Sequence, residues 1–91
     1  MHDEKYMSFE QLPFVASVGG KILAWQPSRS DDYQQECESG RLHFRQLQDL
    51  MCHTDNPLLL SRVLQALGTS GQWGGAEAGF SQAMAEHVMQ R

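Results

Sequence analysis

Residues 30–53 read SDDYQQECESGRLHFRQLQDLMCH, and this stretch decides the fold. Six of its residues follow one another at alternating spacings of four and three, which is the pattern of one face of an α-helix; they are Tyr33, Cys37, Gly40, Phe44, Leu47 and Met51. The pattern predicts a helix over residues 30–53 with this face packed inward. Ser30 or Asp31 is the expected N-cap, and Gly40 is a point where a neighbouring helix can approach closely.

Two further helices are expected downstream of this stretch. Asn56 followed by Pro57 is typical of a helix start, because the Asn side chain caps the helix and proline needs no amide donor there. This second helix, residues 57–67, is rich in leucine and ends at Gly68, so we expect it to be the most buried element. The third helix spans residues 76–90, and its apolar face comprises Ala76, Phe80, Ala83, Met84 and Val88.

Upstream of the long helix, two apolar runs flank a Gly-Gly pair. The runs are FVASV at 14–18 and KILAW at 21–25. Glycine adopts the positive φ angles of a tight hairpin turn, so the pattern favours a β-hairpin in which Val18 faces Lys21 and Phe14 faces Trp25. The alternative is an irregular apolar arm laid across the helices. A lone two-stranded hairpin is only marginally stable in water, so either form must pack on the helical body.

These elements predict a mainly α fold, a three-helix antiparallel bundle with an N-terminal β-hairpin or irregular apolar arm. A small α+β fold is the alternative. The chain has 91 residues, which is the size of one small domain. Residues 1–9 are polar or charged apart from a few positions, and we expect a flexible N-terminus there, followed by a single helical domain over residues 10–91.

The charge balance limits the classes of partner. Eleven acidic residues outnumber seven Lys and Arg, for a net charge of −4. A negative chain is not generally attracted to nucleic-acid phosphates or anionic membranes, so neither direct nucleic-acid binding nor membrane association is expected. The sequence shows no membrane-spanning or signal segment, which predicts a cytoplasmic protein. Cys37 and Cys52 would lie about 22 Å apart on one helix, too far for a disulfide, and free thiols suit a reducing compartment.

No motif for catalysis, a cofactor or a metal ion is apparent. The glycine-rich loop at 68–75 lacks the Lys-Ser/Thr pair of a phosphate-binding loop, and Glu77 would repel an anion from the helix that follows. No C-x-x-C or H-x-x-x-H spacing is present to hold zinc. His43 is expected at the edge of the core, and His87 is expected to be half-buried and bonded to a backbone carbonyl. We therefore predict no catalytic, cofactor-binding or metal-binding residues and no enzymatic activity.

The remaining candidates for function are apolar residues that a partner protein would contact. Trp73, at the centre of the glycine-rich loop, either plugs the core or stands exposed as a binding anchor, and the sequence favours the plug. Leu42 lies opposite the apolar face of the long helix, among polar residues. Phe14 and Trp25, the aromatic residues of the hairpin, complete the set of predicted partner contacts.

By elimination, the sequence predicts a non-enzymatic, small protein-interaction module that acts through a larger partner. One alternative is a small acidic inhibitor of host nucleic-acid machinery, encoded by a mobile element. Its acidic residues are spread along the chain rather than gathered on one face, so the charge pattern does not select it. The other alternative is a structural or regulatory homodimer, joined through a helix face or paired hairpin edges.

Overall fold

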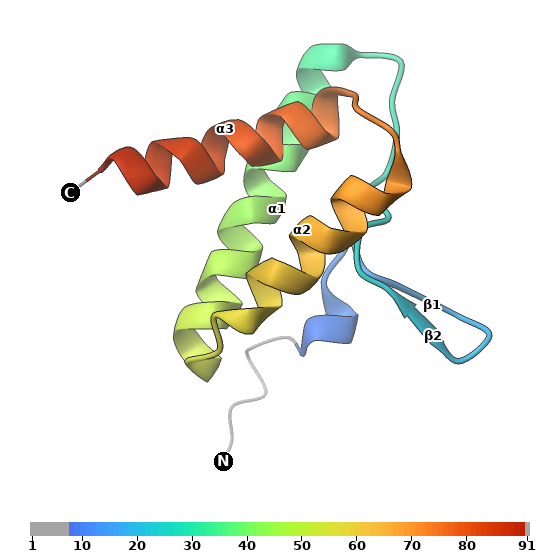
Figure 1. Ribbon diagram of the computed structural model, residues 1–91. Coiled ribbons are helices and arrows are strands. Elements are labelled where there is room, and N and C mark those ends of the chain that lie inside the picture. Colours follow the sequence, from blue (N-terminus) through green and yellow to red (C-terminus); the bar gives the residue numbers. More distant parts are fainter. Residues whose placement is uncertain (1–7, 91) are drawn as a thin grey trace.

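A computed structural model of the chain describes residues 8–90. Three helices pack together, and a two-stranded antiparallel hairpin precedes them, which confirms the predicted fold class. In chain order the elements are η1 (Phe9–Gln11, a 3₁₀ turn), β1 (Ala16–Val18), β2 (Lys21–Leu23), α1 (Tyr33–Thr54), α2 (Leu58–Ser70) and α3 (Gly75–Met89) (Figure 1). No helix among the described residues is both long and apolar enough to cross a membrane.

The short η1 turn shows that packed structure begins earlier than the sequence suggested. Phe9 is buried in the core, and Arg62 of α2 lies over its ring, 4.4 Å from the centroid. Residue 9 therefore belongs to the packed domain and not to a flexible N-terminus. Ser8 is also described, and its backbone N–H donates a hydrogen bond to the side chain of Gln11. The rest of the predicted flexible segment, residues 1–7, lies outside the described residues.

The hairpin has the predicted turn and the predicted register. Gly19 and Gly20 both have positive φ, 57° and 81°, as a two-residue type I′ turn requires. Val18 pairs with Lys21. Regular pairing ends at Ala16 and Leu23, but the strand directions continue far enough to bring the rings of Phe14 and Trp25 to 5.5 Å. The alternative of an irregular arm is therefore wrong.

Helix α1 starts slightly later than expected. Its N-cap is Asp32, and neither Ser30 nor Asp31 takes this role: the Asp32 carboxylate accepts hydrogen bonds from the backbone N–H groups of Gln34 and Gln35. Tyr33, the first residue of the predicted inward face, is 62% exposed. Helix α3 begins beside the main chain of Tyr33 and covers its carbonyl group, so the side chain is left in solvent. Further along that face, Cys37 and Met51 are only half-buried.

The second helix differs most from expectation. It runs past Gly68 to Ser70, and Gly71 supplies the left-handed residue that ends it, with φ of 72°. It is also not the most buried element. Leu58 is 69% exposed and Leu64 is 37% exposed, because only one stripe of α2 faces the core; that stripe consists of Leu59, Val63 and Leu67.

Helices α1 and α3 form the main packing interface. Helix α3 crosses over the first half of α1, with Gly75 beside Tyr33 and Gly79 beside Cys37, and α2 runs in the opposite general direction to both (Figure 1). A Cβ on Gly40 would overlap the Ala76 carbonyl oxygen, and one on Gly79 would overlap the Cys37 carbonyl oxygen. The predicted role of Gly40 as a point of close approach is confirmed, and α3 contributes matching glycines.

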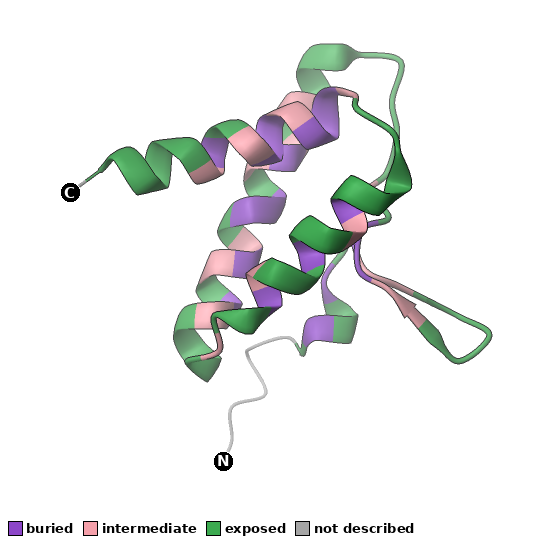
Figure 2. Ribbon diagram, in the orientation of Figure 1, coloured by how far each residue is buried: buried purple, intermediate pink, exposed green. Residues whose placement is uncertain are grey.

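The core lies where α1, α3 and the base of the hairpin meet. Five aromatic rings stack edge-to-face or tilted there, with centroids 4.9 to 6.5 Å apart for neighbouring pairs, and they belong to Phe14, Trp25, His43, Phe44 and Phe80. The last turns of α3 extend beyond this core and are exposed (Figure 2). Val88, expected on the inward face of α3, is consequently 61% exposed.

Candidate interaction surface

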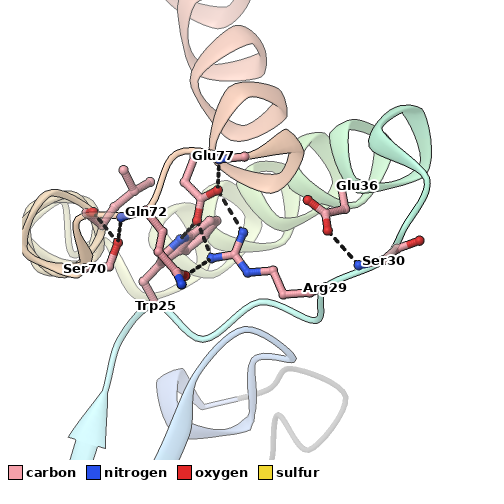
Figure 3. A network of polar contacts seen from close by, with 9 residues as sticks. Trp25, Arg29, Ser30, Glu36, Ser70, Gln72 and Glu77 are labelled. Carbon is pink, nitrogen blue, oxygen red and sulfur yellow. Dashed lines mark hydrogen bonds and ion pairs between the residues drawn. The ribbon is translucent and has the colours of Figure 1, made fainter.

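A buried carboxylate ties the base of the hairpin to the start of α3. The side chain of Glu77 has no exposed surface. Its Oε2 accepts hydrogen bonds from Trp25 Nε1 at 2.8 Å and Arg29 Nη2 at 2.7 Å, and its Oε1 accepts from Arg29 Nη1 at 2.9 Å and the Gly74 backbone N–H at 2.8 Å (Figure 3). Four donors thus satisfy the acceptor sites of this carboxylate.

The electrostatics of Glu77 follow from these contacts. Burial alone acts to raise the pKa of Glu77. The hydrogen bonds from Arg29, Trp25 and Gly74 outweigh that effect and lower the pKa from the ordinary 4.5 to about 2. In turn, the hydrogen bond to Glu77 raises the pKa of Arg29. Glu77 and Arg29 are therefore both charged at neutral pH and form an ion pair there.

This network holds the loop between α2 and α3 on both sides of Trp73. On one side, Gln72 accepts a hydrogen bond from Arg29 Nη2 at 2.9 Å, and its backbone N–H bonds to Ser70 Oγ at 3.3 Å. On the other side, Gly74 is held by Glu77. The Trp73 side chain itself is 64% exposed. The loop is thus fastened immediately before and after a tryptophan that faces solvent.

The exposure of Trp73 corrects the prediction that it plugs the core. The indole that fills the core at this end of the molecule is that of Trp25, which is 3% exposed and packs edge-on against Phe80 at 5.1 Å. Since Trp25 also donates to Glu77, its position is fixed by both polar and apolar contacts. Trp25 occupies this part of the core, and Trp73 lies outside it.

Burial also removes two of the predicted partner contacts. Phe14 is 0% exposed and Trp25 is 3% exposed, so both side chains are packed in the core of the folded chain. The hairpin folds them against His43 and Phe80, since the bundle offers an apolar surface there. Both residues are structural, and the prediction that they contact a partner directly is corrected.

Leu42 is 50% exposed on α1, as expected for a residue opposite the packed face. It does not share a surface with Trp73. The Trp73 loop packs at the first turn of α1, where Gly74 and Gly75 meet Glu36. Leu42 is six residues further along, which is about 9 Å along the helix axis and about 120° around it. The two exposed apolar residues are separate features of the surface.

The histidines and cysteines are dispersed. His43 is buried, and burial lowers its pKa, with partial compensation from a hydrogen bond to Gln46. His87 is exposed and its ring bonds to the side chain of Gln48 at 3.0 Å, which corrects the expectation of a half-buried ring on a backbone carbonyl. Cys37 and Cys52 are free thiols. Within residues 8–90, His, Cys, Asp and Glu form no group of three or more arranged to hold a metal ion.

Sequence reasoning treated Glu77 only as a charge that repels anions and did not single out Arg29. A local signal existed, because a Glu three residues after the N-cap commonly bonds to the N-cap backbone N–H, as Glu77 does with Gly74. Nothing local indicates that Trp25 and Arg29, about fifty residues earlier in the chain, supply the other donors.

No protein-family model matches this chain, and no curated protein or solved structure matches it. Function is therefore inferred from the geometry of the chain itself.

Proposed function

We propose that this protein is a non-enzymatic interaction module that acts through a larger protein partner, and that Trp73 is its principal contact residue. The observation that carries the proposal is the contrast within three consecutive residues. Gln72 and Gly74 are held by the Arg29–Glu77 ion pair, and the large apolar side chain between them is 64% exposed. An exposed tryptophan on a loop that is already ordered is a preorganised anchor.

The energetics favour this kind of anchor. Tryptophan is enriched among residues that dominate binding free energy, because it buries a large area when it enters a pocket of the partner. A loop that is already ordered loses little conformational entropy on binding. The network around Glu77 provides that order, because its carboxylate is fully buried and the hydrogen bonds from Arg29 to Gln72 and from Gly74 to Glu77 already hold the loop in the free chain.

The test is to isolate partners with the tagged full-length chain in its native host and then measure the affinity of each identified partner. Trp73→Ser is expected to weaken binding by at least tenfold. Val88→Ser is the matched control, because Val88 is 61% exposed and lies at the far end of α3. Equal affinities for the wild type and Trp73→Ser across all partners would overturn the proposal.

Leu42 remains a proposed secondary contact, and its place on a different part of α1 makes it separable from Trp73. Leu42→Glu is expected to weaken binding only of a partner that is large enough to cover both Trp73 and Leu42. We also propose a cytoplasmic location, which the free thiols of Cys37 and Cys52 support.

A homodimer is the competing arrangement, and sedimentation distinguishes it. The interaction module is expected to sediment as a monomer at all concentrations measured. A dimer that Trp73→Ser dissociates would place the same residue in a contact between two copies and would replace the proposed partner with a second copy.

A further inference from the structure

A groove of about 460 Å³ lies between α2 and the segment formed by β2 and the three residues that follow it. Ile22, Leu23, Ala24 and the nearly buried Trp25 line it on the strand side, and Ala66 lines it on the helix side. Its polar lining consists of Gln26, Arg62, Gln65, Thr69 and Ser70. Apolar side chains and polar groups along one elongated cleft are the ordinary features of a ligand site.

The strand side of the groove is a free sheet edge. Within residues 8–90 the sheet has two strands, so β2 pairs only with β1. Residues of an antiparallel pair alternate between hydrogen-bonded and non-hydrogen-bonded positions, and a two-residue turn makes Val18–Lys21 a hydrogen-bonded pair. The backbone groups of Ile22 therefore point away from β1, and Ile22 lines the groove. Regular pairing ends at Leu23, so the alternation does not extend to Ala24.

The groove carries one charged side chain, Arg62, and it is a cation in a chain with a net charge of −4. Its guanidinium lies over the ring of Phe9 and has no carboxylate partner among the described residues. None of the hydrogen bonds among the described residues uses its N–H groups, so these groups are available to bind a carboxylate. The side-chain amides of Gln26 and Gln65 are exposed beside it and suit peptide groups as partners.

We propose that this groove binds an extended, acidic segment of the partner protein, which pairs with the free edge of β2 and places a carboxylate on Arg62. This is strand addition to an exposed sheet edge. The inference rests on the proposed function, because it names the chemical class of ligand that the interaction module recognises.

The dimensions of the groove set the length of the segment. Arg62 and Ser70 are eight residues apart on α2, which is about 12 Å, and an extended chain covers that distance in about four residues. Ser70 lines the far end of the groove and bonds to the backbone of Gln72. A segment that starts with its carboxylate at Arg62 and follows α2 thus ends near Ser70, which bonds to the loop that carries Trp73.

The experiment uses a phage-displayed library of random eight-residue peptides, selected on the full-length chain. The selected peptides are expected to be enriched in Asp or Glu and to lose at least tenfold in affinity for Gln65→Trp, whose new indole fills the groove. Leu64→Trp is the matched control, because Leu64 is the adjacent exposed residue of α2 and does not line the groove. Thermal melting establishes that both variants are folded.

The charge and the backbone pairing are tested separately. Arg62→Glu is expected to abolish selection of acidic peptides, while Arg45→Glu, the same charge change on α1, leaves it intact. Two versions of a selected peptide are compared, one N-methylated at its odd-numbered amides and one at its even-numbered amides. One version is expected to lose binding and the other to keep it, since a strand directs alternate amides to its partner.

The outcomes separate this inference from the proposed function. Peptides that are not enriched in acids, that bind Gln65→Trp as well as the wild type, or that tolerate every N-methylation would overturn it. If no peptides are enriched while a protein partner still requires Trp73, the groove proposal fails and the interaction module stands. A concentration-dependent dimer that Gln65→Trp dissociates would make a second copy the occupant and would also overturn it.

Discussion

The indole N–H of Trp25 donates a hydrogen bond to the buried carboxylate of Glu77 across 2.8 Å, and the two residues are 52 positions apart in the chain. This contact joins the segment after the hairpin to the first turn of α3. Arg29 closes it from the solvent side, with 39% of its own side chain exposed. The ion pair fixes the position of the segment after the hairpin relative to the first turn of α3, and it also holds the loop that carries Trp73.

Removing the Glu77 carboxylate is expected to destabilise the protein. In Glu77→Gln, an NH2 group replaces one of the two acceptor oxygens and is itself a donor. Arg29, Trp25 and Gly74 then compete for the single oxygen that remains. An unsatisfied buried donor or a broken buried ion pair costs about 2–4 kcal/mol. Urea unfolding measures the change. Glu38→Gln is the control, because Glu38 is an exposed acid on α1 and its loss is expected to cost less than about 0.5 kcal/mol.

The same carboxylate predicts a pH dependence. The pKa of Glu77 is about 2 in the folded chain and 4.5 ordinarily, so the unfolded chain takes up the proton first as pH falls. The stabilisation is therefore fully present above about pH 4.5 and is lost as pH falls towards 2, by about 1.4 kcal/mol per pH unit. The unfolding free energies of the wild type and Glu77→Gln are expected to converge between pH 5 and pH 3, roughly in line with that slope. A constant difference over this range would contradict the assignment.

Glycine substitutions distinguish close packing from open space. A Cβ at Gly40 would overlap the Ala76 carbonyl oxygen and lie 2.8 Å from the Phe80 nitrogen, both backbone atoms, so Gly40→Ala has to push α1 and α3 apart. We expect a loss of about 3 kcal/mol or more. Gly68→Ala is the matched control inside α2, where a Cβ meets no atom within 4 Å. That variant is expected to gain about 0.5–1 kcal/mol from helix propensity. Equal melting temperatures for the two variants would contradict the described helix interface.

The features that the sequence predicted depend on local chemistry. The hairpin register follows from Gly19-Gly20, because the turn type fixes which residues face each other. The inward position of Phe44 and Leu47 follows from helical spacing. The predicted end of α2 was three residues too early, because Gly68 and Gly71 both suit a helix end. The helix continues past Gly68 for one more turn, in which the Ser70 hydroxyl donates a hydrogen bond to the Leu67 carbonyl.

The candidate site was less accessible to sequence reasoning, because it depends on contacts between distant residues. Hydrophobicity favours burial of both tryptophans equally. Only the fold shows that Trp25 occupies the core and Trp73 does not. The partner of Glu77 is Arg29, 48 positions away, and no pattern along the chain pairs them. The groove beside β2 likewise arises only when α2 is placed against the hairpin.

The contrast between the two tryptophans is directly measurable by fluorescence. Trp25→Phe leaves Trp73 as the single indole, and since that side chain is 64% exposed, its emission is expected to be red-shifted and strongly quenched by acrylamide. Trp73→Phe leaves Trp25, which is 3% exposed and is expected to emit further to the blue and to resist quenching. Trp25→Phe keeps an aromatic ring in the core but removes the donor to Glu77, so its fold is checked by circular dichroism. Equally weak quenching in two folded variants would mean that Trp73 is buried, and the interaction module would then have no exposed tryptophan as its anchor.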